Sequence, residues 1–153
     1  MFHLYSDGGC RSRGLGAWAY AIIRDDQLLE DKSGLIDETT NNRMELYSII
    51  QGLKRFDKAV AEITVFSDSA YCVNCFLQKW YVKWRKNGWK NASHDEVLNR
   101  DLWEELLALV ESFQKPVQWQ LVKGHSGNRW NEHCDSLCGQ QYNNSGIGGI
   151  VKV

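Results

Sequence analysis

Three β-type segments follow one another at the start of the chain, and helices and strands alternate after them. Residues 2–6, 15–24 and 27–36 are rich in aromatic and β-branched residues, and the turn-prone pair Asp25-Asp26 separates the last two. These segments predict an antiparallel three-stranded unit. A strand that follows a helix later in the chain predicts a parallel neighbour, so the sheet must be mixed.

The remaining elements follow from hydrophobic spacing and from capping signals. The sequence predicts, in chain order, an amphipathic helix over 42–57, a strand over 62–67, a helix over 69–78, a helix that Asn99 caps, a strand over 117–122 and a last helix over about 130–142. We therefore expect an α/β fold with a mixed five-stranded sheet flanked by helices. We expect a single domain over 1–153, in which the glycine-rich stretch 143–153 is a loosely docked tail.

Length and composition restrict the class of protein. A chain of 153 residues with 43% hydrophobic content fits one domain with a sizeable core. No apolar run reaches the roughly 18 residues of a membrane span, and the N-terminus lacks the features of a signal peptide. The five cysteines are an odd number and indicate reduced thiols, so we expect a cytoplasmic protein without a membrane partner. The net charge of −1 means that a polyanion must be held by a local basic patch or by bound cations.

Two aspartates directly follow predicted strands. Asp7 lies in YSDGG, where we expect the chain to turn on two glycines, and Asp68 lies in VFSDS. In open α/β sheets, ligands gather outside the carboxyl ends of strands. If strands 2–6 and 62–67 are neighbours, the two carboxylates approach each other, and a divalent cation such as Mg²⁺ is the simplest compensation for their repulsion.

Each acid that could join this site also has a purely structural explanation. An aspartate after a strand is most often a turn former. Glu45 with Asn42 fits the pattern in which a glutamate satisfies a backbone N–H at a helix start. Considered alone, Glu45 is better explained as part of such a helix cap than as a metal ligand. Asp135, considered alone, fits a solvated helix residue. The individual positions therefore leave the structural and the functional explanations open.

Four longer segments connect these acids. TTNNRMEL at 39–46, YSDGG at 5–9, FSDSAY at 66–71 and VKGHSGNRWNEHCD at 122–135 together resemble the type 1 ribonuclease H family, in the same order and over nearly the whole chain. The resemblance implies a ribonuclease H-like fold. It also implies a catalytic His125 and a set of metal-binding, catalytic carboxylates that comprises Asp7, Glu45, Asp68 and Asp135.

The resemblance further implies an endoribonuclease that hydrolyses the RNA strand of RNA–DNA hybrids and works as a monomer. Two Mg²⁺ ions, for which Mn²⁺ is a possible substitute, would lie about 4 Å apart, one activating water and the other stabilising the departing 3′-oxygen. The products would carry 5′-phosphate and 3′-hydroxyl ends. His125 lies in a flexible loop, and an imidazole with a pKa near about 6.5 suits a proton shuttle or a role in product release.

Contacts with the substrate are also implied by the resemblance. The RNA strand near the scissile phosphate would meet Cys10, Asn41 and Asn42, and a DNA-strand phosphate would meet Thr40. Asn41 and Asn42 equally fit helix caps. The loop RSRGLG departs from the family pattern, because Arg13 stands near a position where many members carry an Asn-Pro, and an arginine there could bind phosphate instead. Ala70 stands at a position where family members frequently carry a glutamine, so we expect one contact to a base or sugar to be absent.

The segment KWYVKWRKNGWK at 79–90 contains five basic residues and no acid, interleaved with aromatic residues. Basic side chains neutralise phosphates while aromatic rings lie against sugars or bases. The contacts expected from this segment are Lys79, Trp80, Lys83, Trp84, Arg85, Lys86, Trp89 and Lys90. Tryptophans 80 and 84 lie one helical turn apart and also fit core packing. The segment resembles the basic protrusion that holds the DNA strand in this family.

Alternatives remain at this stage. Cys72 with Cys75, and Cys134 with Cys138 beside His133, could form a zinc site, although cysteines at helical spacing are usually buried apolar groups. A ribonuclease H-like enzyme that acts on DNA is a second functional hypothesis, against which the GHSG loop and the NNRMEL helix argue. A non-catalytic hybrid-binding module is a third, and it would be expected to lack at least one of the acids.

Overall fold

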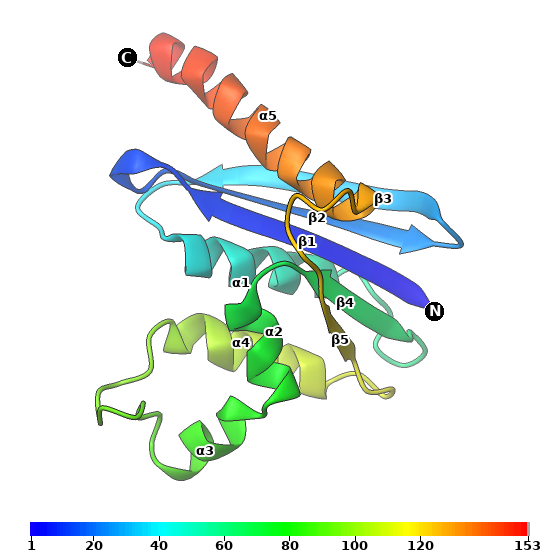
Figure 1. Cartoon of the computed structure of the whole chain (residues 1–153), viewed down its shortest axis with the longest axis vertical. Coiled ribbons are helices and arrows are strands. Elements are labelled where there is room, and N and C mark those ends of the chain that lie inside the picture. The colour runs from blue at the N-terminus through cyan, green and yellow to red at the C-terminus, as the bar shows by residue number, and fades with distance from the viewer. Residues whose placement is uncertain (153) are drawn as a thin grey trace.

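The computed structural model describes residues 1–152, and side chains through residue 144. A five-stranded sheet carries helices on both faces (Figure 1). The elements are β1 (Phe2–Cys10), a 3-10 turn (Ser12–Gly14), β2 (Gly16–Arg24), β3 (Gln27–Ile36), α1 (Asn41–Leu53), β4 (Ile63–Ser67), α2 (Ala70–Leu77), α3 (Trp80–Lys86), α4 (Arg100–Glu111), β5 (Gln118–Leu121) and α5 (Arg129–Lys152). The expected α/β fold with a mixed five-stranded sheet is confirmed.

The sheet has the strand order β3-β2-β1-β4-β5. β1 lies at its centre and pairs antiparallel with β2 and parallel with β4, and β4 pairs parallel with β5. Helix α5 covers one face, while α1, α2 and α4 cover the other (Figure 1). The predicted antiparallel start and the predicted parallel pairing of the first strand with the fourth are both confirmed.

Each face of the sheet has its own core, because successive side chains of a strand point to opposite faces. Leu4 packs in the larger core with α1, α2 and α4, which includes the fully buried Trp103. Tyr5 packs in the smaller core under α5. The two cores hold the central strand β1 from both sides.

The zinc hypothesis is wrong because of this division. Cys72 and Cys75 are buried in the larger core, and Cys134 and Cys138 are buried in the smaller one, on the opposite face of the sheet. All five cysteines of the chain are free thiols. His133 directs Nε2 to Asp31 Oδ2 at 2.7 Å. The cysteines therefore fill the core as small apolar groups.

The first strand is longer than expected, and the chain does not turn at its glycines. Gly8 pairs with Trp18 and Gly9 with Ala17, inside the ladder between β1 and β2. A Cβ atom at Gly8 would lie 2.4 Å from the carbonyl carbon of Met44 and 2.5 Å from the nitrogen of Glu45. This glycine allows the backbone of α1 to approach β1 closely, which is a common reason for a glycine in a strand.

Several helix boundaries also differ from the sequence-based expectations. α1 ends at Leu53, before the expected 57, because Arg55 N–H and Phe56 N–H donate to carbonyls three residues back and tighten the chain into a turn. α3 was not expected as a separate helix. Asn99 stands at the N-cap position of α4, but its left-handed backbone (φ 62°) and the bond from its Nδ2 to Tyr71 Oη (3.1 Å) mean that its side chain does not cap the helix.

Helix α5 continues to Lys152, beyond the expected end at about 142. We expected the tail 143–153 to be loosely docked. Its side chains from residue 145 onward lie outside the described residues, so this expectation stays a prediction. Among residues 1–152, no helix combines the length and the apolar character that crossing a membrane requires.

Candidate active site

Two acids come together where the parallel pairing of β1 with β4 ends, near the carboxyl ends of the two strands. The ladder between the two strands ends at the pair Tyr5 and Phe66, and Asp7 and Asp68 follow shortly after it. Glu45 of α1 joins them, and the three carboxylates offer oxygen atoms that all lie within 4.8 Å of one another. The expected approach of Asp7 and Asp68 is confirmed. We call Asp7, Glu45 and Asp68 the acid cluster.

Glu45 is held by the strand and not by the start of its own helix. The N-cap of α1 is Thr40, whose Oγ1 accepts from Arg43 N–H (3.2 Å), and Glu45 lies beyond the first turn. The Oε1 atom of Glu45 accepts from Gly8 N–H at 3.1 Å. The capping explanations for Glu45, Asn41 and Asn42 are therefore wrong.

One oxygen of Glu45 is the clearest sign of a ligand. Its Oε2 atom is buried and has no hydrogen-bond partner. The neighbouring acids of the cluster are Asp7 and Asp68, so without a bound cation only a proton held on one of the carboxyls could join these oxygens. A buried, unsatisfied carboxylate oxygen is costly, and a hard divalent cation with oxygen ligands would satisfy it. The donor set of this site fits Mg²⁺ or Mn²⁺.

The electrostatics of the acid cluster point the same way. Asp7 is only 8% exposed, and burial together with the charges of Asp68 and Asp135 raises its pKa to about 7. Burial, followed by the charges of Asp7 and Asp68, raises the pKa of Glu45 well above its usual range. Burial also raises the pKa of Asp68. Three carboxylates this close together can all be ionised near neutral pH only if a positive charge compensates them.

Asp135 stands beside the acid cluster. It is exposed on α5 and does not belong to the group of three that share the 4.8 Å limit. It lies close enough for its charge to raise the pKa of both Asp7 and Asp68. The structure therefore brings together three of the four predicted acids and places the fourth at the rim.

His125 also lies near the acid cluster. It is exposed in the loop between β5 and α5 and has a left-handed backbone (φ 56°), and it lies close enough that a protonated imidazole would oppose the rise in the pKa of Asp68. The preceding Gly124 passes close to Asp68, because a Cβ there would lie 2.9 Å from Asp68 Oδ2. The loop is therefore held against one member of the acid cluster.

Sequence reasoning missed two residues that support the acids. Gly8 donates its N–H to Glu45, although the sequence predicts a turn at this glycine. Asn131 is 3% exposed and lies beside Asp68, where its amide opposes the rise that burial causes in the pKa of that carboxyl. Asn131 precedes Asp135 by one helical turn, and this spacing was the available signal for both residues facing the same site.

The residues expected to contact the two strands of the hybrid lie at the start of α1 and at the end of β1, near the acid cluster. Thr40, Asn41 and Asn42 are exposed at the start of α1. Cys10, at the end of β1, is half-buried, and its Sγ lies within hydrogen-bond distance of the carbonyls of Thr39 (3.4 Å) and Arg11 (3.3 Å), which its single S–H can share. Its thiol thus fixes the local backbone as well as lining the surface.

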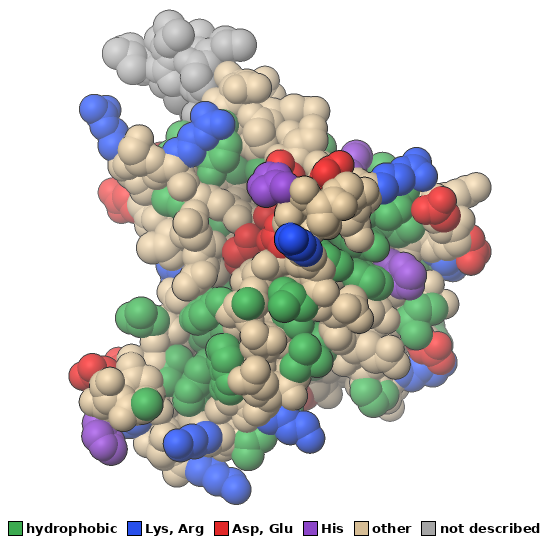
Figure 2. All heavy atoms as spheres, in the orientation of Figure 1, with side chains coloured by type: hydrophobic (Ala, Val, Ile, Leu, Met, Phe, Trp, Pro, Cys, Tyr) green, Lys and Arg blue, Asp and Glu red, His purple; other side chains and the backbone are tan. Residues whose placement is uncertain are grey.

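The basic segment 79–90 presents its lysines outward. Lys79, Lys83, Lys86 and Lys90 are exposed, and within the described part of the chain none of them makes an ion pair. Arg85 differs, because it holds both carboxylate oxygens of Glu111 at 2.7 and 2.8 Å. Figure 2 shows Lys and Arg side chains gathered at the lower end of the face, where Figure 1 places α3, and acidic side chains near its middle.

The tryptophans of this segment face inward. Trp84 packs against Trp103 with ring centroids 5.5 Å apart and against Trp89 at 5.6 Å. Trp80 lies 6.2 Å from Trp84 and is partly buried on the same core. Trp89 is only 7% exposed, so its ring packs in the core and leaves almost no surface for a sugar or base. The exposed lysines are the better candidates for contact with nucleic acid.

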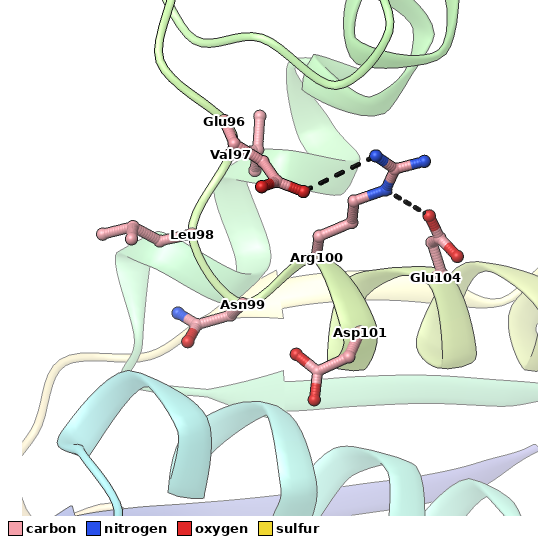
Figure 3. Close-up of a pocket in the computed structure, with 7 residues that line it drawn as sticks. All are labelled: Glu96, Val97, Leu98, Asn99, Arg100, Asp101 and Glu104. Carbon is pink, nitrogen blue, oxygen red and sulfur yellow. Dashed lines mark hydrogen bonds and ion pairs between the residues drawn. The ribbon is translucent and has the colours of Figure 1, made fainter.

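A hollow of about 630 Å³ at the start of α4 is not the site of chemistry. Figure 3 shows its lining residues, Glu96, Val97, Leu98, Asn99, Arg100, Asp101 and Glu104. Arg100 is held between Glu96 and Glu104, and Asp101 binds Arg43 through both oxygens at 2.9 and 2.8 Å. Three acids and one engaged arginine leave no free positive charge for a phosphate.

Comparisons with known proteins agree with this site. The family model described as RNase H matches residues 1–143. Ribonuclease H of Acetivibrio thermocellus is 45% identical over 135 residues, which are 88% of this chain and 89% of that protein. Ribonuclease H of Syntrophomonas wolfei is 42% identical over 135 residues, with 88% and 90% covered.

Two solved structures share the fold. LC9-RNase H1, a type 1 RNase H with the type 2 active-site motif, has a TM-score of 0.75 at 26% identity and covers 92% of this chain and 72% of that one. The N-terminal RNase H domain of a Mycobacterium tuberculosis protein has a TM-score of 0.73 at 19% identity, with 97% of each chain covered.

The fold and the acid cluster, with these likenesses, define a hydrolytic nuclease. The chain belongs to the ribonuclease H family, because the family model covers nearly all of it and the curated relatives are more than 40% identical over most of their length.

Proposed function

We propose that this protein, as a single domain, is an endoribonuclease that hydrolyses the RNA strand of RNA–DNA hybrids. The observation that carries the proposal is the acid cluster, with the unpartnered Oε2 of Glu45, at the end of the paired strands β1 and β4. Membership of the ribonuclease H family supports the substrate class. The presence of all four acids disfavours a non-catalytic binding module.

Asp7, Glu45 and Asp68 would hold two divalent cations, Mg²⁺ or in its place Mn²⁺, with Asp135 as a further ligand from the rim. When bound, such ions activate water and stabilise the charge on the departing 3′-oxygen, which yields 5′-phosphate and 3′-hydroxyl ends. Gly8 N–H fixes one oxygen of Glu45, and the buried amide of Asn131 beside Asp68 favours the ionised form of that carboxyl. These contacts orient the carboxylates before substrate arrives, which reduces the reorganisation required during the reaction.

His125 would move protons at the exposed side of the site. Its loop passes Asp68 through Gly124, so the imidazole is held near the acids and in contact with solvent. Histidine changes its protonation near neutral pH, which suits transfer of a proton to or from the departing group and release of product. In this role His125 is not a metal ligand.

The substrate would be held on both sides of the acid cluster. Asn41 and Asn42, exposed at the start of α1, and Cys10 at the end of β1 would meet the RNA strand near the scissile bond, and Thr40 would hold a phosphate of the DNA strand. The lysines of segment 79–90 would neutralise phosphates of the DNA strand further away. We propose that the protein does this as a monomer.

A cleavage assay tests the proposal. One end-labelled RNA is presented single-stranded, in duplex RNA and in an RNA–DNA hybrid, with Mg²⁺, Mn²⁺ or EDTA, to the wild-type protein, to Asp7→Asn and to Asp25→Asn as an exposed control acid. We expect metal-dependent cleavage of the hybrid alone, retained in Asp25→Asn and lost in Asp7→Asn. A hybrid that is bound and stays intact with either metal would overturn the catalytic proposal, and cleavage of duplex DNA would favour the related DNA-cleaving class.

A further inference from the structure

Helix α5 lies along β1 and leads away from the acid cluster. Cys138 directs its Sγ to the carbonyl of Asp7 at 3.8 Å. Tyr142, one helical turn further on, lies over Gly9, because a Cβ at that glycine would be 3.7 Å from Tyr142 Oη. The next residue of the same face of β1 after Asp7 and Gly9 is Arg11, directly beyond the strand end.

Arg11 stacks on Tyr142. The carbon at the centre of its guanidinium group lies 4.0 Å from the centroid of the tyrosine ring. Arg11 is exposed, and no carboxylate among the described residues pairs with it. A ring face holds a guanidinium in place without neutralising its charge or occupying its N–H donors. The group therefore remains able to bind an anion.

The backbone around Arg11 is tied down. Arg11 N–H donates to the carbonyl of Leu15 at 2.8 Å, and the thiol of Cys10 donates to the carbonyl of Arg11. Thr39 N–H donates to the carbonyl of Gly14 at 2.9 Å, which joins this loop to the segment before α1. A side chain that is already positioned loses less conformational entropy when it binds a ligand.

We infer that Arg11, supported by Tyr142, binds a backbone phosphate of the strand that is cut; this inference rests on the proposed function. Arg11 follows Asp7 by four residues, so the two Cα atoms lie about 13 Å apart along the extended chain. The strand at the acids is the cleaved one, and Arg11 lies beside it, a few nucleotides away. Figure 1 shows the loop after β1 well separated from helix α3, with α1, α2 and α4 between them, so Arg11 and the lysines of α3 hold different parts of the substrate.

Steady-state cleavage of the hybrid at several salt concentrations tests Arg11. For Arg11→Ala we expect KM to rise about tenfold at low salt with kcat unchanged, because one charge-assisted contact made before the reaction is lost. The slope of log KM against log salt concentration should fall by about one, because one phosphate contact is lost. Arg24→Ala is the matched control, since Arg24 is also exposed and also lies over a ring, that of Phe2 at 5.0 Å, yet stands at the other end of β2.

Tyr142 is a positioning residue, and conservative replacement separates its ring from its hydroxyl. Tyr142→Leu should raise KM in the same direction as Arg11→Ala, and the double variant should be no worse than Arg11→Ala alone. Tyr142→Phe keeps the ring and should match the wild type, because the buried Oη has no hydrogen-bond partner. A KM for Tyr142→Leu equal to that of the wild type would contradict the supporting role.

A single uncharged methylphosphonate linkage, moved along the RNA strand or the DNA strand, identifies the phosphate. At one RNA-strand position the wild type should bind less tightly, while Arg11→Ala should be insensitive to the replacement. Equal sensitivity of both proteins at every position, or a position found in the DNA strand, would overturn the inference. A wild-type protein that cleaves no hybrid would instead refute the proposed function, so the two failures are distinct.

Discussion

The carboxyl of Asp7 couples the active site to stability. Its pKa in the folded protein is about 7, because burial and the neighbouring acids Asp68 and Asp135 disfavour its charge. In the unfolded chain an aspartate has a pKa of about 3.9. Since the folded state binds the proton more tightly, the metal-free protein is most stable at low pH in this respect and loses that stability as pH rises from about 4 through 7.

This shift predicts the pH dependence of the metal-free protein. Its free energy of unfolding should be about 2–4 kcal/mol lower at pH 8 than at pH 5. In Asp7→Asn this difference should shrink markedly, whereas the exposed Asp25→Asn should behave like the wild type. Urea denaturation in EDTA at both pH values measures it. An unchanged pH dependence in Asp7→Asn would show that the carboxyl titrates normally in the folded state.

Two adjacent glycines of β1 give a second test at this scale. In Gly8→Ala the new methyl would meet the backbone of α1 at 2.4–2.6 Å, so the helix must move away from the strand and carry Glu45 with it. We expect a loss of about 3 kcal/mol or more. In Gly9→Ala the nearest atoms lie at 3.7 and 4.0 Å, an ordinary contact, and the loss should stay below about 1 kcal/mol. Thermal unfolding of the two variants compares them directly, and equal losses would contradict the close-approach argument.

Among the elements, α3 has one side that packs on the core and another that faces solvent. Its tryptophans pack on the core, and its lysines face solvent. Lys83→Ala combined with Lys86→Ala should leave the melting temperature within about 2 °C of the wild-type value and should raise KM for the hybrid. The slope of log KM against log salt concentration should fall by about two, because two phosphate contacts are lost. Trp84→Ala should instead cost about 2–4 kcal/mol, because the ring contacts Trp89 and Trp103. A double lysine variant with unaltered KM would remove α3 from the substrate interface.

The sequence predicted the elements whose signals are local. Alternation and turn residues located β2 and β3 to within a residue or two, and helical spacing located α1 and α2. The continuation of β1 through Gly8 could not be predicted in this way, because the reason for the glycine is the nearness of a helix that starts more than thirty residues later. Short α3 was missed because its N-cap, Lys79, has a left-handed backbone and a side chain that makes no capping bond.

The sequence predicted some residues of the candidate site but not the contacts that support them. The rule for strand ends brought Asp7 and Asp68 together correctly, although only Asp68 follows its strand; Asp7 lies inside β1, just beyond the point where the parallel pairing with β4 ends. Glu45 looked like a cap until Thr40 proved to occupy that position, and only the family resemblance had marked it. The support from Asn131 depends on how α5 is oriented against the sheet, which is a tertiary property that no local pattern encodes.

For the molecule as a whole, metal binding should act as a stabilising ligand. An ion held by Asp7, Glu45 and Asp68 binds the folded state and not the unfolded one. At a free Mg²⁺ concentration of about 100 times Kd, the stabilisation is about 2.7 kcal/mol, or roughly 5–10 °C in melting temperature. Differential scanning calorimetry at pH 8 measures it, with NaCl of equal ionic strength as the control. Glu45→Gln should reduce the shift, and an equal shift in that variant would place the ion elsewhere.

The position of β1 has a consequence for the order of events during synthesis. β1 is synthesised before the other four strands of its sheet, yet it lies at the centre of the finished sheet, between β2 and β4. Its pairing with β2 needs only a short loop, but its other edge stays unpaired until the chain beyond residue 67 has been made. A nascent chain that stops before β4 therefore exposes an open strand edge and lacks Asp68. Such a chain is prone to pair with the wrong partner and has no complete catalytic centre, so activity arises only once the last two strands have joined.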